Sequence, residues 1–524
     1  MKAFPAFFLV TVLLLLPVCP SVSAVDSKDV KLSDEDLTAL KICEGVIQLF
    51  KQFPDSAWPG YNLVERPFIF YMPERALLFN YPHKVDGFTG YPKDWPDLGT
   101  IVQVHEGQYD NLTGQLYFAL PIDTIDVAAI PYLHKSIVDL FAFIVHENFH
   151  EFQQYGNHPA FGEIPWEREE LYPIQDRQNT ALAYLEMRLL MDALKMMQAG
   201  DREKCGEYVK QFVAVRDYRW KQGDPFVKRY EQAEEINEGT AKYVEVKSVS
   251  LVPKLMYVSS LDGLTTPLLA DFDSLTLYRY LLDDFQNRIT GNAISPVDVG
   301  RYRIYPVGSA QGVLLDYLKI DWKDQTQRAG PEFTYVQLFK QSLKIKDDQL
   351  AALLEKAREN YDYEKVLAST DKLIQEYTES YNKDLAAFEA QSGYRIEIDL
   401  SSKNLSRSSS SSAKRWTVER GTKSLRSHYD VYVLRTVQNS DLLLEIHDTG
   451  ILEQDDWDKR IKKIVFFAPE ITSLSLDGKI LDLTQVTPSQ FKNIELSGNN
   501  LKLNYAKPGT IAISDHTVRI NLLP

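Results

Sequence analysis

The spacing of apolar residues changes near Gly393, and this change limits the folds that the chain can adopt. Between about residues 132 and 391, apolar residues recur at helical spacing, interrupted at turn-forming Pro and Gly. After Gly393, short alternating segments are separated by turn residues about every ten positions, as in a small β-sandwich-like domain. Aromatic and branched segments within residues 58–132, among them 67–71 and 114–120, predict strands before the helices.

The sequence therefore predicts the α+β class. A largely helical domain with an N-terminal β-sheet region is expected over residues 25–392, and a small all-β domain over 393–524. Ser33, followed by acidic residues at 34–36, predicts a helix that begins with a capping box. The serine-rich stretch 401–412 predicts a flexible loop or linker.

The first 24 residues have the pattern of a cleavable signal peptide. Lys2 precedes an apolar stretch over 6–16, and Val22-Ser23-Ala24 supplies the small residues of a cleavage site. No later stretch reaches the roughly 18 apolar residues of a membrane span. We therefore expect a secreted or periplasmic protein without an integral membrane segment once the signal is removed.

The charge of the chain bears on its partners, and its cysteines bear on whether it forms a disulfide. The 524 residues include 58 basic and 73 acidic side chains, a net charge of −15, and no run of Lys and Arg that follows a phosphate backbone. This argues against nucleic acid as a partner. Outside the signal, Cys43 and Cys205 are compatible with one disulfide or with two buried thiols. The oligomeric state stays open.

One short motif carries recognisable chemistry. In the segment from Leu133 to Gly156, apolar residues recur at helical spacing around the sequence HENFH, which is an HExxH motif. His146 and His150 are four positions apart, so both imidazoles project from one helix face and can hold Zn²⁺. Glu147 can take a proton from a zinc-bound water and pass it to a leaving amine.

A zinc site of this kind needs a third ligand, and two clusters offer one. Glu169 and Glu170 lie shortly after the motif, at the short spacing of thermolysin-like enzymes. Glu238 lies much later, in a helical pattern beside the small residues Gly239 and Ala241, which leave room for a neighbouring helix. We favour Glu238. The alternative for Glu238 is a solvated acidic helix face that it shares with Glu231, Glu234 and Glu235.

The combination of HENFH with the later INEGTAKYVE resembles the gluzincin metallopeptidases, and most closely their peptidase MA-like secreted group. The resemblance covers roughly residues 58–330 and implies a zincin-like fold in which His146, His150 and Glu238 bind zinc and Glu147 is the base. Eighty-seven residues separate His150 from Glu238, against about twenty in the best-known gluzincins, so the helices between them are expected to be an insertion packed near the site. No Gly-x-Met-Glu-Asn segment of the aminopeptidase type is present, which leaves endopeptidase and exopeptidase activity open.

The expected function is a secreted zinc-dependent metallopeptidase that acts on a peptide or protein substrate. Tyr302 and Tyr305 are candidates for stabilising the oxyanion, with ordinary aromatic packing as the alternative. Two other functions stay open. One is an exported, non-catalytic binding protein with a structural metal site, and the other is a zinc hydrolase acting on a non-peptide bond.

Overall fold

The computed structural model describes most of the chain and divides it into two compact units. The described residues are 32–72, 74–92, 95, 97–107, 127–132, 136–155, 169–256, 277–328, 332–400, 405–410, 415–418, 423–436, 441–455, 461–483 and 488–523. The signal peptide and its cleavage site, the predicted strand over 114–120, and Gly156 lie outside them. Among the described residues, no helix is both long and apolar enough to cross a bilayer.

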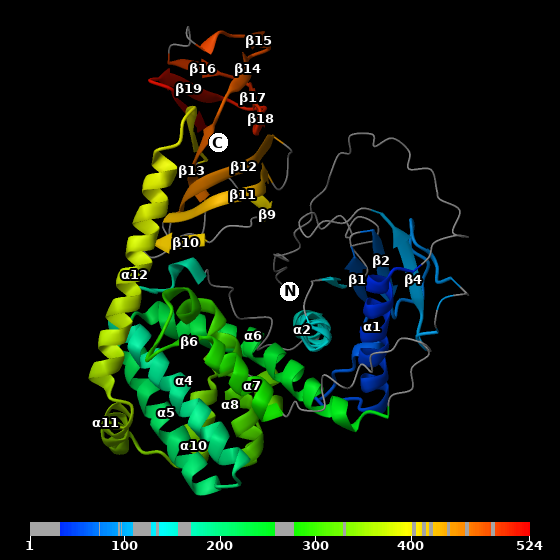
Figure 1. Cartoon of the computed structure of the whole chain (residues 1–524), viewed down its shortest axis with the longest axis vertical. Helices are drawn as coiled ribbons and strands as arrows, with labels where there is room; N and C mark the ends of the chain where they lie inside the picture. Colours follow the sequence, from blue (N-terminus) through cyan, green and yellow to red (C-terminus); the bar gives the residue numbers. More distant parts are fainter. Residues whose placement is uncertain are drawn as a thin grey trace, which may run out of the picture. The chain divides into compact units, whose positions relative to one another are not determined.

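The first unit, residues 27–376, combines a small sheet with a set of packed helices (Figure 1). Helix α1 (Asp34–Gln52) begins at Ser33, whose side chain and backbone form the predicted capping box with Asp36. The sheet of this unit has the strand order β3-β4-β2-β1-β5. Strand β5 is parallel to β1, and the other neighbours are antiparallel. The strands are β1 (Phe68–Met72), β2 (Arg75–Phe79), β3 (Thr89–Gly90), β4 (Val102–Glu106) and β5 (Ala128–Pro131).

Helices form the rest of this unit and share one hydrophobic core with the sheet. Helix α2 follows β5 and packs against α6, α1 and β5, while α4 packs on α5 and α6 on α8. The helices are α2 (Ile137–Tyr155), α4 (Arg177–Gln198), α5 (Arg202–Gln222), α6 (Pro225–Leu251), α7 (Leu277–Asn287), α8 (Ile304–Leu318), α9 (Lys323–Arg328), α10 (Tyr335–Ser342), α11 (Leu350–Asn360) and α12 (Tyr363–Glu389). Short 3-10 or π turns lie at Leu63–Glu65, Glu169–Leu171, Val252–Lys254, Asp298–Tyr302 and Asp347–Gln349, and β6 (Ile289–Thr290) pairs with β7 (Ala293–Ile294).

Cys43 and Cys205 are both buried free thiols in this unit. Burial raises the pKa of each thiol, that of Cys205 to about 11. The expectation of two buried thiols is therefore confirmed, and the alternative of one disulfide is not.

The second unit, from Tyr377 onward, is a curled and largely antiparallel sheet with its own core. Its main path is β15-β14-β17-β18-β12-β13-β8-β20-β19-β16, with β9, β10 and β11 joined to it through β12. The strands are β8 (Tyr394–Asp399), β9 (Leu405–Ser410), β10 (Arg415–Val418), β11 (Lys423–Thr436), β12 (Leu442–Asp455), β13 (Ile461–Ala468), β14 (Ile471–Leu476), β15 (Lys479–Ile480), β16 (Ser489–Phe491), β17 (Ile494–Gly498), β18 (Leu501–Tyr505), β19 (Gly509–Ser514) and β20 (Thr517–Leu522). Helices and sheets together give the predicted α+β class.

The serine-rich stretch does not form the predicted linker throughout. Residues 405–410 form β9, which pairs antiparallel with β11. Strand pairing uses backbone groups, and a strand at the edge of a sheet tolerates small polar side chains. The serine-rich composition therefore did not predict the secondary structure of residues 405–410, which form a strand.

The two units divide between Glu376 and Tyr377, inside α12, whereas the predicted domain boundary at 392/393 coincides with the end of that helix. The second half of α12 packs on the β-sheet of its own unit. The Tyr377 hydroxyl accepts from the Thr417 amide at 2.8 Å, and the ring of Phe388 packs against Phe467 with centroids 5.3 Å apart.

Candidate metal centre

Helix α2 places the HExxH motif at the edge of a hydrophobic core. Phe141, Ile144, Val145 and Phe149 are all fully buried on the face toward the core, as the helical spacing predicted. His146 is buried, and Glu147 and His150 are half-buried. The apolar face of the helix is therefore packed in the core, while Glu147 and His150 keep part of their surface exposed.

Helix α6 brings Glu238 to the same place. The helix begins at Asp224, whose carboxylate accepts from the Phe226 amide, and Pro225 occupies its first turn. At Gly239 the backbone of α6 touches α8, because a Cβ added to Gly239 would lie 2.7 Å from Cα of Gly308. The predicted close approach of a helix beside Glu238 is confirmed.

The three predicted zinc ligands converge on one point. Nε2 of His146 and Nε2 of His150 lie 3.1 Å apart, and each lies 3.2 Å from Oε2 of Glu238. In a tetrahedral zinc site with bonds of about 2.0–2.1 Å, ligand atoms lie roughly 3.3–3.4 Å apart. In the described part of the chain, these three residues form the only His, Cys, Asp or Glu group of metal-binding geometry, and no fourth such residue joins them.

The hydrogen bonds behind the ligands determine which ring nitrogens are free. Nδ1 of His146 lies 3.2 Å from Oε2 of Glu245, and Nδ1 of His150 lies 2.6 Å from Oε1 of Gln153. The Gln153 amide nitrogen donates to the Asn237 carbonyl at 2.8 Å and to Thr240 Oγ1 at 2.7 Å, so the amide oxygen must face His150. Both Nδ1 atoms therefore donate a proton to an acceptor.

With both neutral rings protonated on Nδ1, both Nε2 atoms present lone pairs to each other and to the Glu238 carboxylate. Three acceptors with no donor between them repel one another, so the arrangement requires a cation or an added proton. Hydrogen bonds to Glu238 and Glu245 outweigh the effect of burial and raise the pKa of His146 to about 10 when a proton fills this role. The residues present fit zinc, and metal binding at this point displaces that proton.

Glu245 belongs to a buried polar cluster that sequence reasoning missed. It accepts a hydrogen bond from Tyr280 at 2.6 Å and forms an ion pair with Lys242. Although burial opposes ionisation, Lys242 and the hydrogen bond from His146 lower the pKa of Glu245 to about 2. Its spacing of seven residues from Glu238 on one helix is the signal that could have identified it.

Of the two tyrosines predicted as oxyanion candidates, the structure brings only Tyr305 to the ligands. Its ring stacks on His146 with centroids 5.8 Å apart, and Arg301 donates to its hydroxyl at 3.0 Å. Arg301 also lies 3.6 Å from Oε1 of Glu238. Tyr302 is 43% exposed and packs under the guanidinium of Arg288.

Of the two acidic residues weighed against Glu238, the structure describes the side chain of Glu169. Glu169 forms an ion pair with Arg301 at 3.3 Å, and the side chain of Glu170 lies outside the described residues.

The alternative for Glu238, a solvated acidic face on α6, does not hold, because Glu231, Glu234, Glu235 and Glu238 are all buried. Glu231 pairs with Arg219 at 2.5 Å and also with Arg303, and Glu235 pairs with Arg216 at 2.7 Å. These ion pairs with arginines from other elements offset the cost of burying the carboxylates of Glu231 and Glu235.

No protein-family model, curated protein or solved structure matches this chain.

Proposed function

We propose that this protein is an exported zinc-dependent hydrolase with a zincin-like catalytic unit, and that its substrates are peptides or proteins. The observation that carries the proposal is the convergence of His146, His150 and Glu238 as three lone-pair donors on an HExxH helix. A structural zinc site has four protein ligands, whereas a catalytic site has three and keeps one position open. Among the described residues the set has three members, which favours catalysis over a structural role.

The protein side chains divide the chemistry among them. His146, His150 and Glu238 would hold zinc, which would supply Lewis-acid chemistry toward the scissile carbonyl and water when bound. Glu147, next to the first ligand, accepts the proton of the attacking water and delivers it to the leaving amine. Tyr305 beside His146 would donate a hydrogen bond to the developing oxyanion, and Arg301 positions its hydroxyl through a hydrogen bond of 3.0 Å.

A combined measurement of metal and hydrolysis tests the proposal. Purified protein is assayed for zinc by mass spectrometry and digested against a broad peptide library, as wild type and as Glu147→Gln. We expect about one zinc per chain in both proteins and a rate at least roughly 100-fold lower in the variant, because an amide cannot accept the water's proton.

Asp139→Asn is the matched control, since Asp139 is an exposed carboxylate on the same helix. It should keep both zinc and activity. Undiminished hydrolysis by Glu147→Gln would overturn the mechanism. Zinc without any peptide cleavage by the wild type would favour a non-peptide substrate or a binding protein.

A further inference from the structure

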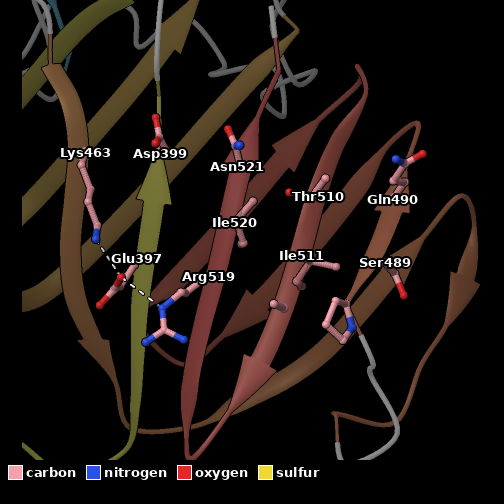
Figure 2. A pocket seen from close by; sticks show the side chains of 12 residues that line it. Glu397, Asp399, Lys463, Ser489, Gln490, Thr510, Ile511, Arg519, Ile520 and Asn521 are labelled. Carbon is pink, nitrogen blue, oxygen red and sulfur yellow. Dashed lines mark hydrogen bonds and ion pairs between the residues drawn. The ribbon is translucent and has the colours of Figure 1, made fainter.

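The second unit contains a pocket that belongs to no part of the metal centre. It has a volume of about 470 Å³ and lies on one face of the sheet, across β13, β8, β20, β19 and β16 (Figure 2). The opposite face of the same strands is core, with Ile396, Ile398, Val518 and Ile520 all essentially inaccessible. Because side chains alternate along a strand, most of the pocket lining comes from the remaining positions, and Ile511 and Ile520 of the buried positions also border it.

Five polar side chains form a row across these strands. The pairing places Lys463 opposite Asp399, Asp399 opposite Asn521, Asn521 opposite Thr510, and Thr510 opposite Gln490. Figure 2 shows the five labelled side chains in this order over the strands. With strands about 4.8 Å apart, the row spans roughly 19 Å.

The row alternates groups that donate and accept hydrogen bonds. Asp399 accepts, Asn521 and Gln490 do both, and the Thr510 hydroxyl does both. Within the described part of the chain, Thr510, Asn521 and Gln490 make no side-chain hydrogen bond to another residue. These groups are therefore available to a ligand without breaking a contact.

The charges in the pocket neutralise one another. Glu397 pairs with Lys463 at 2.7 Å and with Arg519 at 3.5 Å (Figure 2). Arg395 also pairs with Glu397, at 2.8 Å. Lys463 and Arg519 balance Glu397 and Asp399 among the lining residues. An anionic ligand would have to compete with Glu397 for both cations, and a cationic ligand would meet them directly.

We propose that this pocket binds a neutral oligosaccharide. A chain of sugar rings presents hydroxyl groups at regular intervals, each both a donor and an acceptor, and so matches a row of carboxylate, amide and hydroxyl groups across successive strands. The lining also includes the apolar residues Pro488, Ile511, Ala512 and Ile520. Apolar side chains between polar groups can pack against the C–H faces of sugar rings.

Titration of the full chain with defined oligosaccharides tests the proposal. The probes are cellotetraose, chitotetraose, laminaritetraose and maltotetraose, compared with the anionic tetragalacturonate and with tetra-alanine, and binding is measured by calorimetry. The Glu147→Gln protein is used so that no peptide is consumed. We expect at least one neutral tetrasaccharide to bind, and Asn521→Ala and Thr510→Val each to weaken it roughly tenfold.

Glu495→Ala is the matched control, because Glu495 is exposed on β17 of the same sheet and does not line the pocket. It should bind like the parent protein. The proposal is overturned if no neutral tetrasaccharide binds at millimolar concentration, if tetragalacturonate or tetra-alanine binds more tightly, or if the row variants bind as well as the control. None of these results depends on zinc or on hydrolysis.

Discussion

The side chains that hydrogen-bond to His146 and His150 are themselves oriented by further hydrogen bonds and ion pairs. Gln153 is oriented by backbone and hydroxyl groups of α6, and Glu245 by Lys242 and Tyr280. These partners hold the protons of both rings on the side away from Glu238. In the proposed zinc site, the orientation of both imidazole rings would therefore depend on residues that are not ligands themselves.

Alanine variants of the two candidates for the third ligand are expected to retain different amounts of zinc. Glu238→Ala should lose zinc sharply, because it removes a charged ligand 3.2 Å from both ring nitrogens. Glu169→Ala should keep zinc nearly unchanged, since its carboxylate pairs with Arg301. The measurement is zinc stoichiometry after dialysis, with folding followed by circular dichroism. Full retention in folded Glu238→Ala, with loss in Glu169→Ala or Glu170→Ala, would transfer the ligand to the earlier cluster.

Glu245→Gln tests the role of the second carboxylate. The amide removes the charge that supports His146 and leaves Lys242 without its closest anion, so we expect zinc affinity to fall about 10–100-fold. Chelator competition measures this affinity, and Glu355→Gln on the exposed face of α11 serves as the control. Equal zinc affinity in the two variants would show that Glu245 does not position the ring.

At the scale of helices, the site depends on the crossing of α6 and α8. Gly239 and Gly308 face each other there, and α6 delivers Glu238 from the residue before the contact. A side chain on either glycine must separate the two backbones. The position of the third ligand is thus tied to the packing distance between two helices.

Gly308→Ala should destabilise the protein by about 1–3 kcal/mol, because the new Cβ would lie 2.6 Å from Cα of Gly239. The same substitution at Gly206, within α5, meets no atom within 4 Å and should stabilise by about 0.5–1 kcal/mol through helix propensity. Urea unfolding of the two variants provides the comparison. A Gly308→Ala protein as stable as the wild type would mean that the crossing relaxes without cost.

At the scale of the whole molecule, helix α12 has residues in both units. Val366 belongs to the core of the first unit, and Asp371 pairs with Arg177 at 2.8 Å. Beyond the division, Tyr377, Tyr381 and Phe388 are buried. The helix is continuous although the packing changes along it.

Truncated chains should reveal this division. A chain ending at Glu376 should fold and bind zinc, because the metal centre and its buried partners all lie between residues 27 and 376. A chain ending at Gln391 should also bind zinc, but it exposes the three aromatic side chains and should self-associate more. Zinc content and light scattering distinguish the two. Loss of zinc from both folded chains would show that the second unit is needed for the site.

Local patterns in the sequence were sufficient for the helix with His146, Glu147 and His150 and for the capping box at Ser33, because both depend on residues within one or two turns. The small residues around Glu238 correctly indicated a close helix contact. Only the tertiary structure revealed the partners Glu245, Gln153 and Arg301, the arginines that bury Glu231 and Glu235, the strand within the serine-rich stretch, and the polar row over β8, β20 and β19. These features join residues that are distant in sequence or depend on backbone pairing, and neither composition nor periodicity encodes which distant groups will meet.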